Sequence, residues 1–174
     1  VYQLKEHLEY AYNVKQLARI HHPNPPFSIK AWVIDQTRRD FKIGEQIVLG
    51  VESERDCYIL LINLDSQGNF YLLFPNRYHQ DNFIKGNIPV RIPDEAMRSK
   101  FQLEFRLPVG EEMVKVIATT EPLNLQALGL GDFSENFQTI SGKTRTIFVQ
   151  GVIETLSSTR FDWSEDTVTI RSHE

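Results

Sequence analysis

Residues Cys57–Phe74 have the sequence CYILLINLDSQGNFYLLF, which contains the clearest structural pattern in the chain. The first eight residues are almost all apolar, as in a strand that is covered on both faces. The segment Asp65–Asn69 then supplies turn-forming residues, among them Gly68, which can adopt a positive φ. Phe70–Phe74 is again apolar and aromatic. These residues therefore predict a β-hairpin whose first strand lies at the centre of a sheet.

Shorter segments on either side of this hairpin predict further strands. They are Ile29–Ile34, Ile47–Val51, Phe83–Asn87, Val90–Ile92, Phe101–Leu107, Met113–Ala118 and Thr167–Arg171. Pro89 and Pro93 confine Val90–Ile92 to an edge or a crossover, and we expect Phe101–Leu107 to form a hairpin with Met113–Ala118. Most connections are too short for the helical crossovers of ~10 or more residues that parallel strands need. The sequence therefore predicts a mainly β fold, an antiparallel β-sandwich of immunoglobulin-like kind.

One helix is expected at each end of this β-rich region. An N-terminal amphipathic helix is predicted, with an apolar side formed by Leu4, Leu8, Ala11, Val14 and Ala18. It must end before the proline-rich segment 21–26, because proline lacks an amide donor. Near the C-terminus, Phe148, Val152 and Leu156 repeat every four residues and favour a helix over 144–156. The many β-branched residues there leave a strand as the alternative.

The domain organisation follows from the proline-rich segment. Residues 1–26 are expected to be a helix and linker from a preceding domain, and residues 27–174 to be a β-sandwich accessory domain. Two roles stay open for the helix. It can pack on the sheet that follows, or it can connect the sheet to another domain.

Composition and charge exclude several classes of protein. The chain has 174 residues and a formal net charge of -4, which does not produce the positive field that non-specific nucleic-acid binding requires. No apolar run approaches the ~18 residues that span a bilayer. The single cysteine cannot form an internal disulfide, and together with the lack of an export signal or lipid-anchor cysteine it favours the cytoplasm. Nucleic acid and a membrane-spanning role are therefore not expected.

The residues that carry most enzyme chemistry do not form a recognisable constellation. Cys57 lies in an apolar run, where a thiolate would be poorly solvated, and is expected to be a core thiol. The histidines lack the spacing of a zinc site, and the basic step at Arg38 and Arg39 is expected to be a solvated turn. Solvation also explains the carboxylates at strand ends and turns, which are Glu45, Glu52, Glu54, Asp56, Glu111 and Glu112. We therefore expect no catalytic residue, no metal, no cofactor and no enzymatic activity in this chain itself.

Surface recognition is the remaining class of function. The loop from Pro75 to Asn87 contains Asn76, Arg77, Tyr78 and His79, which combine donors, an aromatic face and a titratable imidazole. These four residues are the predicted partner-binding site. As an alternative, the loop can pack Tyr78 and Phe83 under the sheet. A competing site is an edge strand at Phe101–Leu107, where Glu104 and Arg106 would discourage strand addition.

A series of motifs in the middle of the chain supplies a family resemblance. They occur in the order Phe41–Ile47, Asp56–Asn63, Gly68, Leu73–Asn76, Asn82–Gly86, Ile92-Pro93, Pro108–Glu111 and Val116–Thr119. Over about Trp32–Pro122 the chain resembles the bacterial domain of unknown function 4384. Within this pattern Tyr58 and Phe74 are expected to anchor the core.

The resemblance implies an accessory role. Members of that family look like modules appended to caspase-like peptidases, serine/threonine kinases and other multi-domain bacterial proteins. It therefore implies a non-catalytic regulatory or partner-recruiting module of a larger bacterial protein, with a protein or peptide as partner, such as an upstream catalytic domain of the same chain. An adhesive or scaffold module of a cell-envelope assembly is the alternative.

Overall fold

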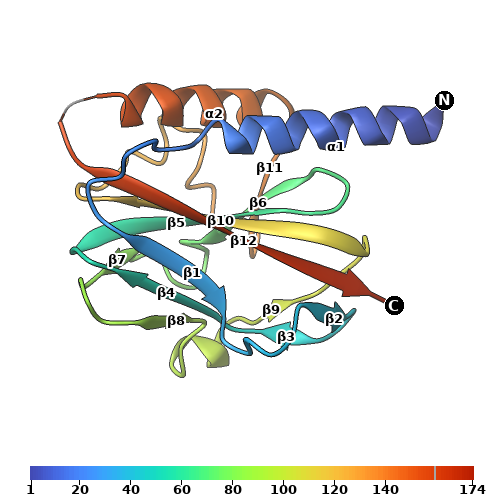
Figure 1. Ribbon diagram of the computed structural model, residues 1–174, viewed down its shortest axis with the longest axis horizontal. Coiled ribbons are helices and arrows are strands. Elements are labelled where there is room, and N and C mark those ends of the chain that lie inside the picture. The colour runs from blue at the N-terminus through green and yellow to red at the C-terminus, as the bar shows by residue number, and fades with distance from the viewer. Residues whose placement is uncertain (159) are drawn as a thin grey trace.

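The computed structural model describes residues 1–158 and 160–174. Its elements are arranged in layers, as Figure 1 shows. Helices α1 (Tyr2–Ala18) and α2 (Gly142–Leu156) both lie over one face of a seven-stranded sheet, and two small sheets lie on the other face. Neither helix within these described residues has the length and hydropathy needed to cross a membrane.

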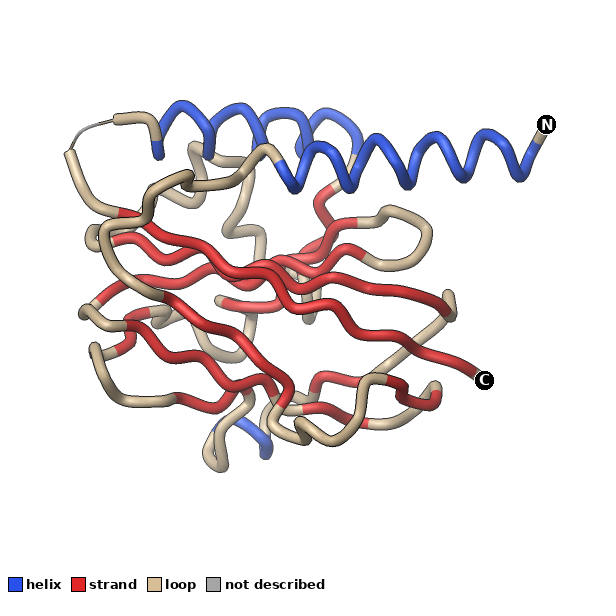
Figure 2. Tube along the Cα trace, in the orientation of Figure 1, coloured by secondary structure: helices blue, strands red, loops and turns tan. Residues whose placement is uncertain are grey.

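The seven-stranded sheet contains the predicted hairpin at its centre. Its strands follow the order β11 (Gln138–Ile140), β6 (Phe70–Phe74), β5 (Cys57–Leu64), β10 (Gly110–Thr119), β12 (Trp163–His173) and β2 (Asp40–Lys42), and β7 (Phe83–Ile84) also pairs with β5. All pairs are antiparallel except β2 with β12. Figure 2 shows the long strands crossing the middle of the molecule.

The two smaller sheets complete the sandwich. One has the order β1 (Ile29–Val33), β4 (Leu49–Ser53) and β8 (Val90–Ile92), and the other pairs β3 (Gln46–Ile47) with β9 (Leu103–Glu104). A short 3-10 helix, η1 (Met97–Ser99), precedes β9. The strand Val90–Ile92 therefore lies at an edge, as Pro89 and Pro93 predicted.

Two hydrophobic cores lie on opposite faces of the large sheet, and β5 contributes to both. Ile59 and Leu61 face the core shared with the small sheets, whereas Leu60 and Ile62 face the core under the helices. This double burial explains the nearly continuous apolar run, since a strand covered on both faces needs no polar side. The mainly β antiparallel architecture with one helix near each end is confirmed.

Several predictions of strand pairing and extent are wrong, and among them only Phe83–Ile84 of the predicted strand 83–87 forms a strand. The segment Ile47–Val51 is divided between two sheets, because the chain passes from β3 to β4 at Val48. Only Leu103–Glu104 of the predicted strand 101–107 form a strand, paired with the two residues of β3, although the backbone of Phe105 still exchanges hydrogen bonds with Gly44 and Glu45. The strand β10 does not pair with it but lies between β5 and β12, because residues 114–119 are buried on both faces and need a central position.

The predicted apolar side of α1 is not the side that packs. Leu4 and Leu8 are 65% and 62% exposed, whereas Leu17 and the polar Asn13 are buried. Figure 1 shows that the N-terminal part of α1 extends beyond the sheet, whereas its C-terminal part lies over it. Asn13 Nδ2 donates a hydrogen bond to the carbonyl of Gly68, in the turn between β5 and β6.

The two expected core anchors differ in burial. Phe74 is 2% exposed and belongs to the core between the sheets. Tyr58 is only partly buried and contacts Phe83 edge to face, with 5.4 Å between ring centroids. Tyr58 is therefore not a core anchor, because it lies near the start of β5, between Phe83 of β7 and Thr119 of β10, and its ring stays partly exposed.

Candidate functional site

A cleft of about 570 Å³ lies between the large sheet and the segment 102–108 that contains β9. Its apolar lining is formed by Ile47, Leu73, Leu103, Phe105, Leu107, Pro108, Val114, Phe137 and Ile170. Its polar lining is formed by Asn63, Asp65, Tyr71, Gln102, Glu104, Arg106, Glu112, Glu135 and Asn136. An apolar cleft with a few polar groups is the usual form of a ligand site.

The floor of the cleft is polar because the side chains on the inner face of the large sheet change from apolar to polar at one end. Along β10 the alternating inner residues are Ala118, Val116 and Val114, and the next position holds Glu112. Along β5 the inner residue after Leu61 is Asn63, which is paired in register with Val114 on one side and Tyr71 on the other. The sandwich core therefore continues into the cleft, with polar side chains in place of apolar ones.

Glu112 is a buried carboxyl group of this floor, with 8% of the residue exposed. Its Oε2 accepts a hydrogen bond from Asn63 Nδ2 at 3.1 Å. Burial raises the pKa of Glu112 from 4.5 to about 7, because the loss of hydration outweighs the stabilisation by Asn63, and the charge of Asp65 raises it further. Glu112 therefore changes its charge near neutral pH.

Asp65 and Tyr71 lie beside Glu112. Asp65 is buried, and its Oδ1 accepts hydrogen bonds from the backbone amides of Gln67 and Asn69, both at 2.9 Å, which fixes the hairpin turn. Burial raises the pKa of the Tyr71 hydroxyl, and the negative charge of Asp65 and its hydrogen bond with Tyr71 raise it further. The turn between β5 and β6 therefore places a second carboxylate next to the floor.

Asn63 leaves one acceptor unused. Its Oδ1 is buried and has no hydrogen-bond partner among the described residues, while its Nδ2 is bonded to Glu112. A buried polar atom without a partner is unfavourable, and such atoms in folded proteins call for an explanation such as a bound ligand. Asn63, one of the residues that line the cleft, therefore has an unused acceptor and is bonded to a buried carboxyl group.

The predicted partner-binding loop lies next to the cleft. Within it Asn76 is 2% exposed and makes the turn, because its Oδ1 accepts the amides of Tyr78 and His79 at 2.9 and 3.1 Å. His79 stacks on Phe74 with 5.4 Å between ring centroids. Asn76 and His79 therefore shape the loop, and only Arg77 and Gln80 of this turn are exposed.

The other two predicted residues hold a wall of the cleft. Tyr78 donates a hydrogen bond from its hydroxyl to Oδ1 of Asn136 at 2.7 Å, and Arg77 donates to the carbonyl of Ser134 at 3.3 Å. The ring of Tyr78 also stacks on Phe101, which in turn contacts Phe137. Because Asn136 and Phe137 line the cleft, the structure brings this loop against the cleft wall.

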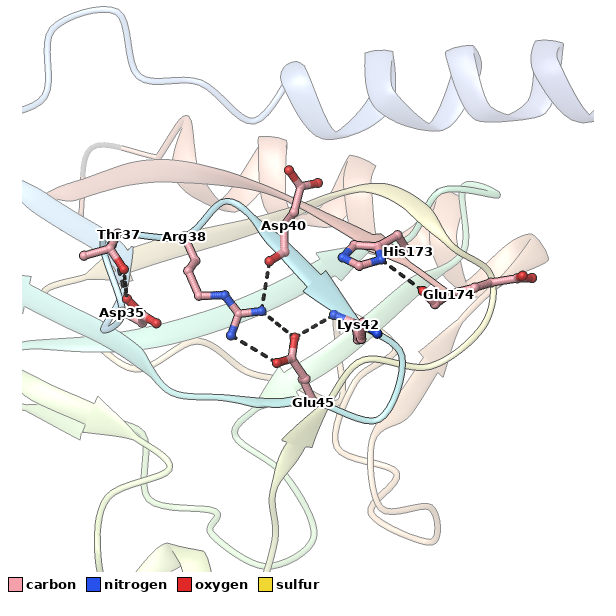
Figure 3. A network of polar contacts seen from close by, with 8 residues as sticks. All are labelled: Asp35, Thr37, Arg38, Asp40, Lys42, Glu45, His173 and Glu174. Carbon is pink, nitrogen blue, oxygen red and sulfur yellow. Dashed lines mark hydrogen bonds and ion pairs between the residues drawn. The ribbon is translucent and has the colours of Figure 1, made fainter.

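The other residues considered in the sequence lie in the core or form contacts within the fold. Cys57 is fully buried, and burial raises the pKa of its thiol. Arg38 forms two hydrogen bonds with Glu45, from Nη1 to Oε1 at 3.0 Å and from Nη2 to Oε2 at 2.6 Å, as Figure 3 shows. Arg38 also lies over the ring of Phe41 at 4.7 Å. No cluster of three or more metal-ligating side chains occurs within the described residues.

Sequence reasoning missed the floor of the cleft. It assigned Glu112 to a solvated turn, and this is wrong, because β10 begins at Gly110 and continues the alternation of Val114 and Val116 back to Glu112. That alternation was the signal that could have found the residue. Asn63 and Tyr71 were hidden inside apolar segments, and only the pairing of β5 with β6 and β10 brings them together.

Comparison with known proteins identifies one family. A family model described as Domain of unknown function (DUF4384) matches residues 40–122. The resemblance found in the sequence is confirmed over these residues, which extend from β2 through β10 and include Asn63, Asp65, Tyr71 and Glu112. No curated protein matches the chain.

Proposed function

We propose that this chain, which carries the DUF4384 domain, is a non-catalytic module that recruits a protein or peptide partner for a larger bacterial protein, such as a caspase-like peptidase or a kinase. The cleft beside β9 is the proposed binding surface. The observation that carries the proposal is its construction, with apolar walls, a polar floor and a volume of about 570 Å³.

The predicted loop supports this assignment of the surface. Tyr78 and Arg77 contact residues 134–137, and this segment supplies Glu135, Asn136 and Phe137 to the cleft. We propose that Arg77 and Tyr78 act by positioning that wall, while Asn76 and His79 fix the shape of the loop. The loop and the cleft then form one recognition surface.

The burial of Cys57 favours a recognition role over covalent catalysis by a cysteine nucleophile. A nucleophilic cysteine needs access to solvent and a lowered pKa. Cys57 has no exposed surface, and burial raises its pKa. Its position in the core between the sheets supports the role of a packed side chain.

The exposed side of α1 supports attachment to another domain. Tyr2, Leu4, Leu8 and Tyr12 are all more than half exposed on this helix. Exposed large apolar side chains that lie together mark surfaces that contact other proteins. In the proposed function α1 is the connector, and the cleft faces a different partner.

The experiment is selection from a random peptide library, followed by titration of selected peptides into the isotope-labelled chain. Nuclear magnetic resonance then maps the contact. We expect shifts at the cleft, and affinities that fall about tenfold, roughly 1.4 kcal/mol, in Leu107→Ala/Phe137→Ala. Leu107 is 72% exposed in the cleft lining, so its truncation leaves the core intact, whereas Phe137 packs against Phe101 and the core, so the amide spectrum of the double variant must first show that it is folded.

The matched control is Ile147→Ala, which removes an exposed apolar side chain from α2 on the other face of the sheet. It should leave the affinity unchanged. Selected peptides that shift only α2, or that bind the Leu107→Ala/Phe137→Ala variant as tightly as the wild type, contradict the proposal. The absence of any selected peptide contradicts it as well.

A further inference from the structure

We propose that the cleft accepts one cationic side chain, a lysine or an arginine of the partner peptide, whose charged end reaches Glu112 and Asn63 on the floor. This inference rests on the proposed function and names the chemistry that the cleft recognises. Glu112 lines the cleft and is 8% exposed, and of its two carboxylate oxygens only Oε2 accepts a hydrogen bond in the described part of the chain.

The unused atoms of the floor are acceptors. They are Oε1 of Glu112 and the buried Oδ1 of Asn63. Both belong to side chains joined by the bond from Asn63 Nδ2 to Glu112 Oε2, so their positions are fixed relative to each other. An ammonium or guanidinium group supplies only donors, which are the groups that two free acceptors require.

The charges around the cleft have the sign that a cation needs. Four carboxyl groups line it, those of Asp65, Glu104, Glu112 and Glu135, against one guanidinium group, that of Arg106. Arg106 is exposed on the outer segment, whereas Asp65 and Glu112 are buried at the floor. The excess of negative charge is therefore greatest where the end of an inserted side chain would lie.

The walls match the aliphatic part of such a side chain. Leu73 and Val114 line the cleft beside the polar floor, on the same face of the large sheet, and Phe137 lines it from the segment 134–137. Lysine and arginine bury their methylene groups against apolar surface while the charged end contacts polar groups. An acidic side chain would add a further negative charge beside Glu112 and Asp65, and a neutral apolar side chain would leave both acceptors without a partner.

Binding of a cation is coupled to the protonation of Glu112. Because the pKa of free Glu112 is about 7, the carboxyl group is largely protonated at pH 6 and must lose its proton to pair with the ligand. The affinity should therefore rise as the pH increases from 6 to 8. The other groups that face Glu112 are Asn63 from β5, Asp65 from the hairpin turn and Tyr71 from β6, with Glu104 and Arg106 from the segment across the cleft.

The test uses three probes with the same backbone, the N-acetyl methylamides of lysine, arginine and norleucine, titrated into the chain. The side-chain amide resonances of Asn63 and the resonances of the cleft are followed by nuclear magnetic resonance. We expect at least one of the two cationic probes to bind at the cleft about tenfold more tightly than norleucine at pH 8. The same cationic probe should bind about tenfold more weakly at pH 6 than at pH 8. The lysine and arginine arms show which cation the floor prefers.

Two variants make the test specific. Glu112→Gln keeps the size of the side chain and the bond from Asn63, and it should remove both the preference for a cation and the pH dependence. Glu111→Gln is the matched control, because Glu111 is the neighbouring residue but is exposed and pairs with Arg171 at 3.8 Å. Norleucine binding as well as both cations, or Glu112→Gln retaining the preference, overturns the inference.

The inference and the proposed function fail in different ways. If library peptides bind in the cleft but the cationic probes show no preference over norleucine, the inference is wrong and the recruiting role stands. If no library peptide binds, the proposed function is wrong. In that case the cationic probes test only whether the cleft binds a small free cation, and not a cationic side chain of a partner peptide.

Discussion

Asn63 on β5 donates a hydrogen bond to Glu112 on β10, with 3.1 Å between Nδ2 and Oε2, at positions where the inner face of the sheet would otherwise be apolar. Two residues further along β5 and β10 the same face holds Leu61 and Val114. The chain thus places a polar pair where apolar residues would stabilise the fold more. Such local exceptions to a consistent core are typical of functional sites.

The stability of the protein should fall as the pH rises towards 7 because of Glu112. The folded state holds the proton of Glu112 up to a pKa of about 7, whereas a glutamate of the unfolded chain loses it near 4.5. Between these values the folded state binds more protons, so each step up in pH favours unfolding, and the effect levels off above 7. Over that window the wild type should lose roughly 3 kcal/mol that Glu112→Gln does not lose. Urea denaturation at a series of pH values measures the difference.

Glu111→Gln provides the comparison for this pH profile. Its side chain is exposed on the opposite face, so its stability profile should run parallel to that of the wild type. If the free energy of unfolding changes with pH equally in Glu112→Gln and in the wild type between pH 5 and 7, the pKa of Glu112 is not raised in the folded state. Such a result would also remove the basis for the cation site.

Much of the fold could be predicted because the decisive residues are local. The apolar run 57–64 and the turn residues after it specify the central hairpin without reference to the rest of the chain. The same holds for α2, whose buried residues Phe148, Val152 and Leu156 repeat every four positions. The pairing of β10 could not be predicted in this way, because its partners β5 and β12 are distant in sequence and alternation does not identify a neighbour.

The candidate site was predicted only in part, for the same reason. The loop 76–79 is distinctive in composition, and it does lie against a cleft wall. The floor needs Asn63, Tyr71 and Glu112 from three strands, and no one segment of the sequence shows them together. The N-terminal helix was assigned the wrong contact face because periodicity reports that a helix is amphipathic but not where its axis passes the sheet.

Removing the hydroxyl of Tyr78 should loosen the cleft wall. Tyr78→Phe loses the bond to Asn136, which contributes about 1 kcal/mol, while the ring keeps its stacking on Phe101. Hydrogen exchange of the amides in 134–137 should become several-fold faster. The control is Tyr12→Phe, which removes the hydroxyl of an exposed tyrosine on α1. Unchanged exchange in 134–137 for Tyr78→Phe would mean that Asn136 is held by other contacts.

Two glycine substitutions should differ in their effect on stability. A Cβ on Gly86 would lie 2.7 to 2.9 Å from backbone atoms of Arg55 and Glu54, which cannot move without shifting the chain, so Gly86→Ala should cost about 1–3 kcal/mol. Gly151 lies inside α2, and its new Cβ would meet only the end of the Leu128 side chain. Gly151→Ala should be neutral, or stabilising by about 0.5–1 kcal/mol, because alanine favours the helix. Thermal denaturation ranks the two, and equal effects would contradict the close approach at Gly86.

Replacement by alanine of the two aromatic residues expected from the sequence to anchor the core should cause different losses of stability. Phe74→Ala removes a ring that is 2% exposed and should cost about 3–5 kcal/mol. Tyr58→Ala removes a partly buried ring that contacts Phe83, and should cost about 1 kcal/mol. Chemical denaturation of both variants gives the comparison. Equal losses would place Tyr58 in the core after all.

The thiol of Cys57 should react only when the protein opens. It is fully buried, and burial raises its pKa, so both access and the thiolate fraction are low in the folded state. Labelling by an aromatic disulfide reagent should therefore be at least about a thousandfold slower than in urea, since local or global opening must come first. Variants that destabilise the core, such as Phe74→Ala, should speed the labelling in proportion to their loss of stability. Rapid labelling of the folded wild type, independent of that stability, would show an accessible thiol and would make Cys57 a candidate nucleophile again.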